Sequence, residues 1–434
     1  MKAVRSVLNS LWTYVIIGLV TFYVLLYVFL DLPSRLEEIP AVNPLRTTLG
    51  ALATGLISAQ ALVFTISLVA AQLNARYTHR MVSRVFTWPT ALYMGLFIGS
   101  AVYSLVVLAA LSSLPTDFVV HLPVVKPIHP VTVAIALAGT CLVLLVPYLW
   151  SFKKLLDPEM MAKDEGRRAE RRLQRGMGTE PPEVAALDNI VMSAYGYKDY
   201  DTFATGLQAL SQVGMVAWRL SRAGVGESIF RRIAHIGMAT VDDPRAPSHL
   251  VDALAGTSNT LMDQGMHEAA RKAVVAISEI GEAALETSQV AATNLVVFSL
   301  GDLGSRASQL GLVVTAEETA SSLGYLGAKT AQRGLVDPTR QVASSLRRVG
   351  TRAAEYGLNL VIRQALISLW SLGARASQDL PQCLDVVAGE LELLERVADP
   401  ELADASYSST PRSPSLEDFH DWYLDNNRHT SRAG

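Results

Sequence analysis

The feature that most constrains the fold is a motif that recurs at a fixed step through the second half of the chain. An aliphatic residue is followed three positions later by a second aliphatic residue, then directly by glycine, and three positions after the glycine by a small residue, in most units Ala or Thr. Every step is 23 residues except one of 21 residues. The first aliphatic position is occupied by Leu210, Ile233, Leu254, Ile277, Leu300, Leu323, Leu346 and Leu369.

This step indicates one helix per unit. A helix of about 17 residues and a short turn fill one unit, and two units make a hairpin of about 46 residues, as in HEAT-like solenoids. The sequence therefore predicts a cytoplasmic α-solenoid of eight such units over residues 185–400. The third unit is degenerate, with Thr257 and Ser258 at the second aliphatic and glycine positions. Between units, Gly265, Gly311, Gly334 and Gly357 recur in phase and predict left-handed caps at helix C-termini.

Inside a helix, each glycine of the motif costs about 1 kcal/mol relative to Ala. We interpret these glycines as points of close contact between helices, because such contact offsets that cost. A phosphate-binding role is excluded, since they do not cluster in a loop before a helix N-terminus. The glycines are Gly214, Gly237, Gly281, Gly304, Gly327, Gly350 and Gly373.

Residues 1–152 are predicted to form a four-helix transmembrane domain. Apolar segments lie at about residues 11–30, 49–73, 90–111 and 131–150, and about 20 apolar residues cross a bilayer core. A cleaved signal peptide is rejected, because no small-residue cleavage site follows the first segment. Lys2 and Arg5 precede the first segment and a basic cluster at residues 153–175 follows the fourth. By the positive-inside rule, both termini are cytoplasmic and the protein is a multi-pass inner-membrane protein.

The second apolar segment carries a polar stripe. Thr54, Ser58, Thr65 and Gln72 fall on one face of a helix. They either line a hydrated path in an oligomer or let neighbouring helices approach, and we favour the second because hydroxyl-rich faces are ordinary helix-packing surfaces. Acidic and basic residues are absent from the depths of the four segments, which argues against proton pumps and ion-coupled transporters.

A basic ridge follows that stripe. Arg76, Arg80 and Arg84 recur every four residues, so a continuing helix presents them together. The ridge suits anionic lipid head groups or an acidic strip of the cytoplasmic domain. The alternative is that these residues follow the topology rule and are solvated.

Part of this region carries a family resemblance. Residues 63–73 read VFTISLVAAQL, residues 76–80 read RYTHR and residues 96–103 read LFIGSAVY. Over about residues 50–111 the chain resembles, as a divergent member, the bacterial predicted-membrane-protein family called domain of unknown function 2254. The resemblance implies a membrane topology and a bacterial inner-membrane setting. It implies no activity.

Residues 153–184 are predicted to be a basic helix and linker, and residues 401–434 a flexible tail with a short acidic and aromatic segment. In that segment Phe419, Trp422 and Tyr423 share one side of a helix. Two interpretations are a partner-binding regulatory tail, with Thr410 or Ser413 as modification sites, and a disordered end or a cap on the last repeat. We favour the second, because chain termini are commonly loose.

The sequence offers no catalytic, cofactor or metal site. His235, His249 and His267 stand on separate units, and Cys141 and Cys383 lie far apart. A net charge of −3 argues against nucleic-acid binding. We therefore expect a non-enzymatic, all-α membrane protein that is a homo-oligomer, contacts lipid and binds a cytoplasmic protein on its scaffold or sensor domain. The alternative is an oligomeric channel or transporter whose second helix lines the path and whose solenoid gates it; a lipid-surface enzyme ranks third.

Overall fold

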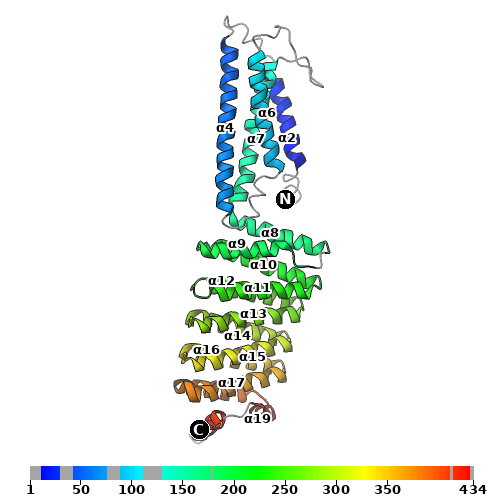
Figure 1. Cartoon of the computed structure of the whole chain (residues 1–434). Coiled ribbons are helices and arrows are strands. Elements are labelled where there is room, and N and C mark those ends of the chain that lie inside the picture. Colours follow the sequence, from blue (N-terminus) through cyan, green and yellow to red (C-terminus); the bar gives the residue numbers. More distant parts are fainter. Residues whose placement is uncertain are drawn as a thin grey trace. The chain divides into compact units, whose positions relative to one another are not determined.

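The computed structural model describes residues 11–29, 43–75, 88–110, 130–176, 179–410 and 414–430. Over these residues the regular structure is entirely helical, with 17 α-helices and one short 3-10 helix (Figure 1). The chain divides into two compact units, Met1–Met161 and Ala162–Gly434.

The first unit contains α2 (Leu11–Val28), α4 (Asn43–Ala75), α6 (Trp88–Ala110) and α7 (Pro130–Leu156). Helix α7 packs against the other three, and α4 also packs against α6. Leu56, Phe97 and Cys141 form its buried core. Each of the four predicted apolar segments lies largely in one of these helices, as the sequence predicts.

Two of these helices hold 18-residue windows that are apolar enough to cross a membrane, Leu49–Ile66 in α4 and Tyr93–Ala110 in α6. Among the described residues, α2 and α7 contribute the shorter apolar stretches Ile16–Val28 and Pro130–Val146. Length and composition therefore support two candidate spans, and the four-span arrangement stays a prediction.

The second unit is a regular stack of helices (Figure 1). It opens with α8 (Pro158–Gln174) and α9 (Pro182–Gly196). The predicted repeat units follow as α10 (Tyr200–Arg219), α11 (Ala223–Thr240), α12 (Ala246–Asp263), α13 (His267–Glu286), α14 (Val290–Gln309), α15 (Val313–Gln332), α16 (Val336–Glu355) and α17 (Asn359–Asp379). The stack continues with η2 (Pro381–Cys383) and α18 (Leu384–Glu395). One helix per unit agrees with the prediction, but most repeat helices have 20 residues rather than about 17.

The helices are longer than predicted because three residues suffice for most turns. The middle residue is left-handed, with φ near +70° at Gly265, Gly311, Gly334 and Gly357, which confirms the predicted caps. The third residue then donates its N–H to the carbonyl of the small motif residue, as Leu312 does to Ala307 at 2.8 Å and Leu358 to Ala353 at 2.9 Å. The carbonyl group of the small motif residue thus accepts the hydrogen bond that closes a Schellman cap.

Consecutive helices alternate between two layers. The even layer contains α10, α12, α14, α16 and α18, and the odd layer contains α9, α11, α13, α15 and α17. Each helix packs on its sequence neighbours and on the next helix of its own layer. This arrangement brings residues about two units apart in the chain side by side, which is how an α-solenoid builds a continuous core.

Each motif glycine leaves a gap, here called a glycine notch, that side chains of following helices fill. A Cβ added to Gly304 would lie 2.7 Å from Val349 Cγ2, and one added to Gly237 would lie 2.6 Å from Ile280 Cγ1. Val349 and Ile280 are the second aliphatic residues of the units two further along. The same holds for Leu326 at Gly281 and Leu372 at Gly327. At these four notches the glycine of one unit and the second aliphatic residue of another are therefore the two halves of one contact.

The 21-residue step also has a structural basis. Helices α11 and α12 have 18 residues each, and the turn between them holds five residues, 241–245. Asp243, in this turn, accepts hydrogen bonds from Lys198 Nζ at 2.5 Å and Tyr200 Oη at 2.7 Å. Both helices are thus shorter than the 20-residue repeat helices. Residues at and just before the start of α10 hold the longer turn between them in place.

The predicted flexible tail at residues 401–434 is largely helical instead. Helices α19 (Pro400–Ser409) and α20 (Pro414–Thr430) both pack on α17. Phe419 is fully buried in the notch of Gly373, and the Tyr423 hydroxyl donates to Glu395 Oε2 at 2.7 Å. Aromatic burial thus outweighs a composition typical of linkers, and the segment forms the cap on the last repeat that the sequence left open.

The predicted linker at residues 153–184 contains more regular structure than expected. Helix α7 runs on to Leu156 and α8 is the predicted basic helix. Gly166 of α8 lies against Ala209 of α10, and Arg172 pairs with Glu183 at 2.9 Å. Helix α8 is therefore the first helix of the stack rather than a free linker.

Candidate functional site

The membrane polar stripe lies on the outer side of α4. Thr54, Ser58, Thr65 and Gln72 are all exposed, whereas Leu56 and other buried residues of α4 face α6 and α7. The Thr54 and Thr65 hydroxyls donate to the carbonyls one turn earlier, both at 2.8 Å. The two threonine hydroxyls of the stripe are therefore hydrogen-bonded, and the stripe faces away from the core of its own unit. The ridge of Arg76, Arg80 and Arg84 lies outside the described residues.

The even layer carries a row of grooves in the second unit. One of about 330 Å³ lies between α10 and α12, one of about 520 Å³ lies mainly between α12 and α14, and one of about 660 Å³ is lined by α14, α16 and α18. Their linings come from similar positions of successive even-layer helices, because the repeat places those positions in register. We call this row the even-layer groove.

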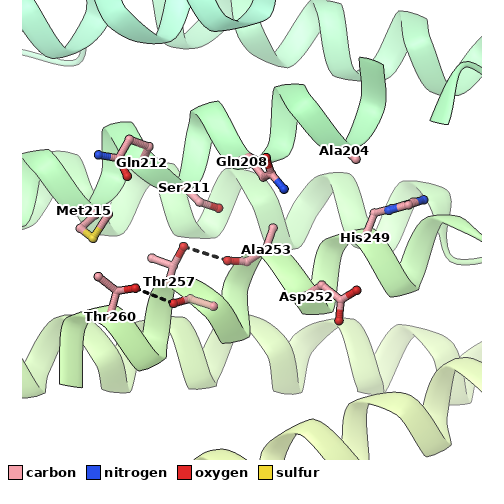
Figure 2. A pocket seen from close by; sticks show the side chains of 11 residues that line it. Ala204, Gln208, Ser211, Gln212, Met215, His249, Asp252, Ala253, Thr257 and Thr260 are labelled. Atoms are coloured by element: carbon pink, nitrogen blue, oxygen red, sulfur yellow. Dashed lines mark hydrogen bonds between the residues drawn. The ribbon is translucent and has the colours of Figure 1, made fainter. Parts of the chain in front are cut away.

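The portion between α10 and α12 is polar (Figure 2). Figure 2 shows Gln208 and Ser211 on α10 facing His249 and Asp252 on α12. Thr257, from the degenerate unit, donates to the Ala253 carbonyl at 2.8 Å. In the neighbouring portion the equivalent lining residue is aliphatic, Leu303.

Several polar atoms in the groove have no hydrogen-bond partner among the described residues. Ser211 is 3% exposed and its Oγ is one of them. Asn259 Oδ1 and Ser305 Oγ are two more in the second portion, and Asn294 Oδ1 is another in the third. Buried polar atoms are normally hydrogen-bonded, so these unpartnered atoms mark the groove lining as a place where a bound molecule or water would supply the missing partner.

Charges along the even layer are mostly neutralised by ion pairs. Arg348 binds Asp302 at 2.7 Å, Arg306 binds Asp263 at 2.8 Å, and Arg347 pairs with Glu390. Asp252, which lines both the first and the second portion, is in no such pair among the described residues. The first portion thus offers one unpaired carboxylate among amides and hydroxyls, and Asp337 in the third portion is a second carboxylate without an ion pair among the described residues.

The arrangement supplies hydrogen bonds and charge. The described residues hold no group of three or more His, Cys, Asp or Glu side chains that could bind a metal, and Cys141 and Cys383 are both buried thiols. Side chains of this kind, repeated along a row of grooves, are suited to binding another molecule.

Sequence reasoning did not find this groove, because its walls come from helices two units apart. One signal was present in the sequence. The degenerate unit, with Thr257 and Ser258, marks a polar portion of the groove.

The comparisons bear on the first part of the chain. Residues 8–195 match a family model described as "Predicted membrane protein (DUF2254)", which extends beyond residues 50–111 on both sides. No curated protein matches the chain. A solved structure of a circular tandem repeat protein with novel repeat topology and enhanced subunit contact surfaces aligns at 13% identity and a TM-score of 0.36, over 84% of this chain and 86% of that one. Such a TM-score does not establish a shared fold. Over residues 8–195, which include α2 through α8, the chain is similar to the DUF2254 family of predicted membrane proteins.

Proposed function

We propose that the protein is a membrane-anchored scaffold whose even-layer groove binds an extended segment of a partner protein. The observation that carries this proposal is the recurrence of unpartnered acceptors, Ser211 Oγ, Asn259 Oδ1 and Asn294 Oδ1, along one row of grooves. An extended main chain offers N–H groups at regular intervals to such acceptors.

The spacing of the layer suits an extended segment. Neighbouring helix axes in a packed layer are about 8–10 Å apart, which is about three residues of extended chain. Equivalent positions on α10, α12, α14, α16 and α18 would therefore meet about every third residue of the segment. A row of this kind binds through many modest contacts, so sequence preference depends on the few side chains that enter pockets.

The setting that we propose follows the charge pattern. Four crossings with both termini in the cytoplasm would put the basic residues near Lys2 and at positions 153–175 on the same side as the solenoid. The scaffold would then recruit a cytoplasmic protein to a bacterial inner membrane, without turnover of a substrate.

The test uses the full chain in nanodiscs and a displayed library of linear random peptides of about 15 residues, long enough to cross the five even-layer helices. Peptides selected on the natural chain should lose binding to Ser299→Trp, which fills the second portion of the groove. The matched control is Ser321→Trp, an exposed odd-layer position, and it should bind normally. Recovery of no binding peptide, or equal binding to both variants, would overturn the proposal.

A second function is favoured by one observation, the outward position of Thr54, Ser58, Thr65 and Gln72 on α4. In a homo-oligomer these side chains would surround a common axis and replace water around a permeating solute. Purified chain in planar bilayers should then conduct, and Thr65→Leu and Gln72→Leu should reduce the conductance. Bilayers that stay silent with the natural chain would reject this function in favour of helix packing or lipid contact.

A further inference from the structure

The notch of Gly214, on a helix that lines the portion of the groove between α10 and α12, is filled differently from four of the other notches. At Gly237, Gly281, Gly304 and Gly327 the notch receives the second aliphatic residue of the unit two further along. At Gly214 an added Cβ would lie 2.9 Å from Phe230 Cε1 and 3.3 Å from Ile229 Cγ2, so the next helix already fills the gap. The residue that would otherwise fill it, Thr257, is instead part of the groove lining.

The lining of this portion is rich in hydrogen-bond acceptors. The Ser211 Oγ is buried and unpartnered, the Gln208 and Gln212 amides each supply a carbonyl oxygen, and Asp252 supplies a carboxylate. The lining contains no Lys or Arg. Arg219 donates to Met215 Sδ at one end, but Gln264 Oε1 accepts its Nε at 2.8 Å.

The remaining lining is small and apolar. Ala204, Ala253 and Gly256 leave room along the walls, and Met215 supplies a flexible apolar surface. Such walls fit a methylene stem, while the acceptors and Asp252 fit a cationic head with several donors.

We infer that this portion of the groove is a specificity pocket for a basic side chain, Lys or Arg, of the bound segment. The inference rests on the proposed function, because it assigns one anchor of the segment that the even-layer groove would hold. The choice of a basic side chain follows from charge complementarity with Asp252. An acidic anchor would meet an unpaired carboxylate and be repelled.

The experiment begins with peptides selected on the full chain in nanodiscs. Replacing each Lys or Arg of a selected peptide by norleucine should weaken binding at one position by about tenfold, which corresponds to about 1.4 kcal/mol. Asp252→Asn should produce the same loss on the natural peptide and no further loss on the norleucine peptide. Glu286→Gln, an exposed acid on odd-layer helix α13, is the matched control and should leave affinity unchanged.

A charge exchange makes the test independent of folding defects. Asp252→Lys should reject the natural peptide and bind a peptide that carries Glu at the anchor. Selected peptides whose affinity does not depend on Asp252 would overturn the pocket while leaving the proposed function intact.

A second probe distinguishes failure of the pocket from failure of the proposed function. Acetyl-arginine amide, followed by saturation-transfer NMR on the full chain, should show contact that Asp252→Asn and Ser211→Ala each reduce, whereas acetyl-citrulline amide should show none. If no peptide is recovered but acetyl-arginine amide binds in this way, the extended-segment function fails and the pocket stands. If acetyl-arginine amide and acetyl-citrulline amide give equal signals, the pocket is not selective for a cation and the inference fails.

Discussion

At the scale of single residues, each motif glycine has a lower helix propensity than Ala but allows a close contact between helices. Gly327→Ala would place a Cβ 2.7 Å from Val342 Cγ1 and 3.2 Å from Leu372 Cδ1. Overpacking costs about 1–3 kcal/mol and better helix propensity returns about 1 kcal/mol, so we expect a net loss of about 1 kcal/mol. Amide hydrogen exchange in α15 to α17 measures it.

Gly389→Ala is the matched control, because Gly389 also lies inside a helix, α18, but an added Cβ meets nothing within 4 Å. It should stabilise α18 by up to about 1 kcal/mol. If Gly327→Ala stabilised its helix equally, the notch would not be the reason for the glycine.

The turn residues give a second prediction at this scale. Ser288 has φ of +60° at the position where the equivalent turns use Gly311 or Gly334. A side chain is strained in that conformation, so Ser288→Gly should stabilise the turn between α13 and α14 by about 1 kcal/mol. Gly311→Ser, in the next turn between helices, should destabilise that turn by a similar amount. Thermal unfolding of the full chain in detergent compares the two, and a gain from both or a loss from both would contradict the strain argument.

At the scale of elements, α20 is attached to the repeat through a contact that depends on pH. Burial raises the pKa of the Glu395 carboxyl, an effect that the hydrogen bond from Tyr423 opposes and the nearby Asp404 and Glu392 carboxylates reinforce. Because the folded pKa lies above the ordinary value of 4.5, this group favours attachment fully below that value and loses its contribution as pH rises through the raised pKa.

We therefore expect the exchange protection of α20, corrected for intrinsic rates, to fall as pH rises above about 4.5. Glu395→Gln keeps a carbonyl acceptor for Tyr423 and removes the titrating group, so its protection should change less over the same range. His420, which stacks on Tyr407 at 4.1 Å between ring centroids, is present in both forms and serves as an internal reference. Identical pH profiles in the two forms would assign the effect to another group.

The same elements show what the sequence could and could not predict. The 23-residue period and the glycine caps are local, because one helix and one turn set them, and both were predicted. Which residue fills a notch depends on a helix about 45 positions away, so the pairing of Val349 with Gly304 could not be read from one unit. The sequence left the order of α20 open because its Ser- and Pro-rich approach is typical of a linker, whereas in the structure Phe419 packs on the aromatic ring of Trp370. The groove could not be predicted either, because its walls also come from helices two units apart in the chain.

At the scale of the whole molecule, the solenoid is a one-dimensional stack, so a local defect affects only its neighbours. The weak place is the degenerate unit. Helices α11 and α12 contact each other less than any other consecutive pair from α9 to α18. We expect α12 to exchange its amide hydrogens faster than α10 or α14.

The last prediction couples this weak place to the pocket. Phe230→Val opens the Gly214 notch and should cost about 2–4 kcal/mol, and Thr257→Leu alone should crowd the space that Phe230 occupies, at about 1–3 kcal/mol. Together they restore the pattern seen at Gly237, Gly281, Gly304 and Gly327, in which an aliphatic residue from two units further along fills the notch. The double variant should therefore be more stable than the sum of the single effects by about 1–3 kcal/mol, measured by exchange in α10 to α12. Because the same leucine would withdraw the Thr257 hydroxyl from the groove lining, the double variant should also bind the basic side chain less well than the natural chain. Strictly additive effects would mean that Phe230 and Thr257 do not share one space, and the origin of the pocket would have to be sought elsewhere in α12.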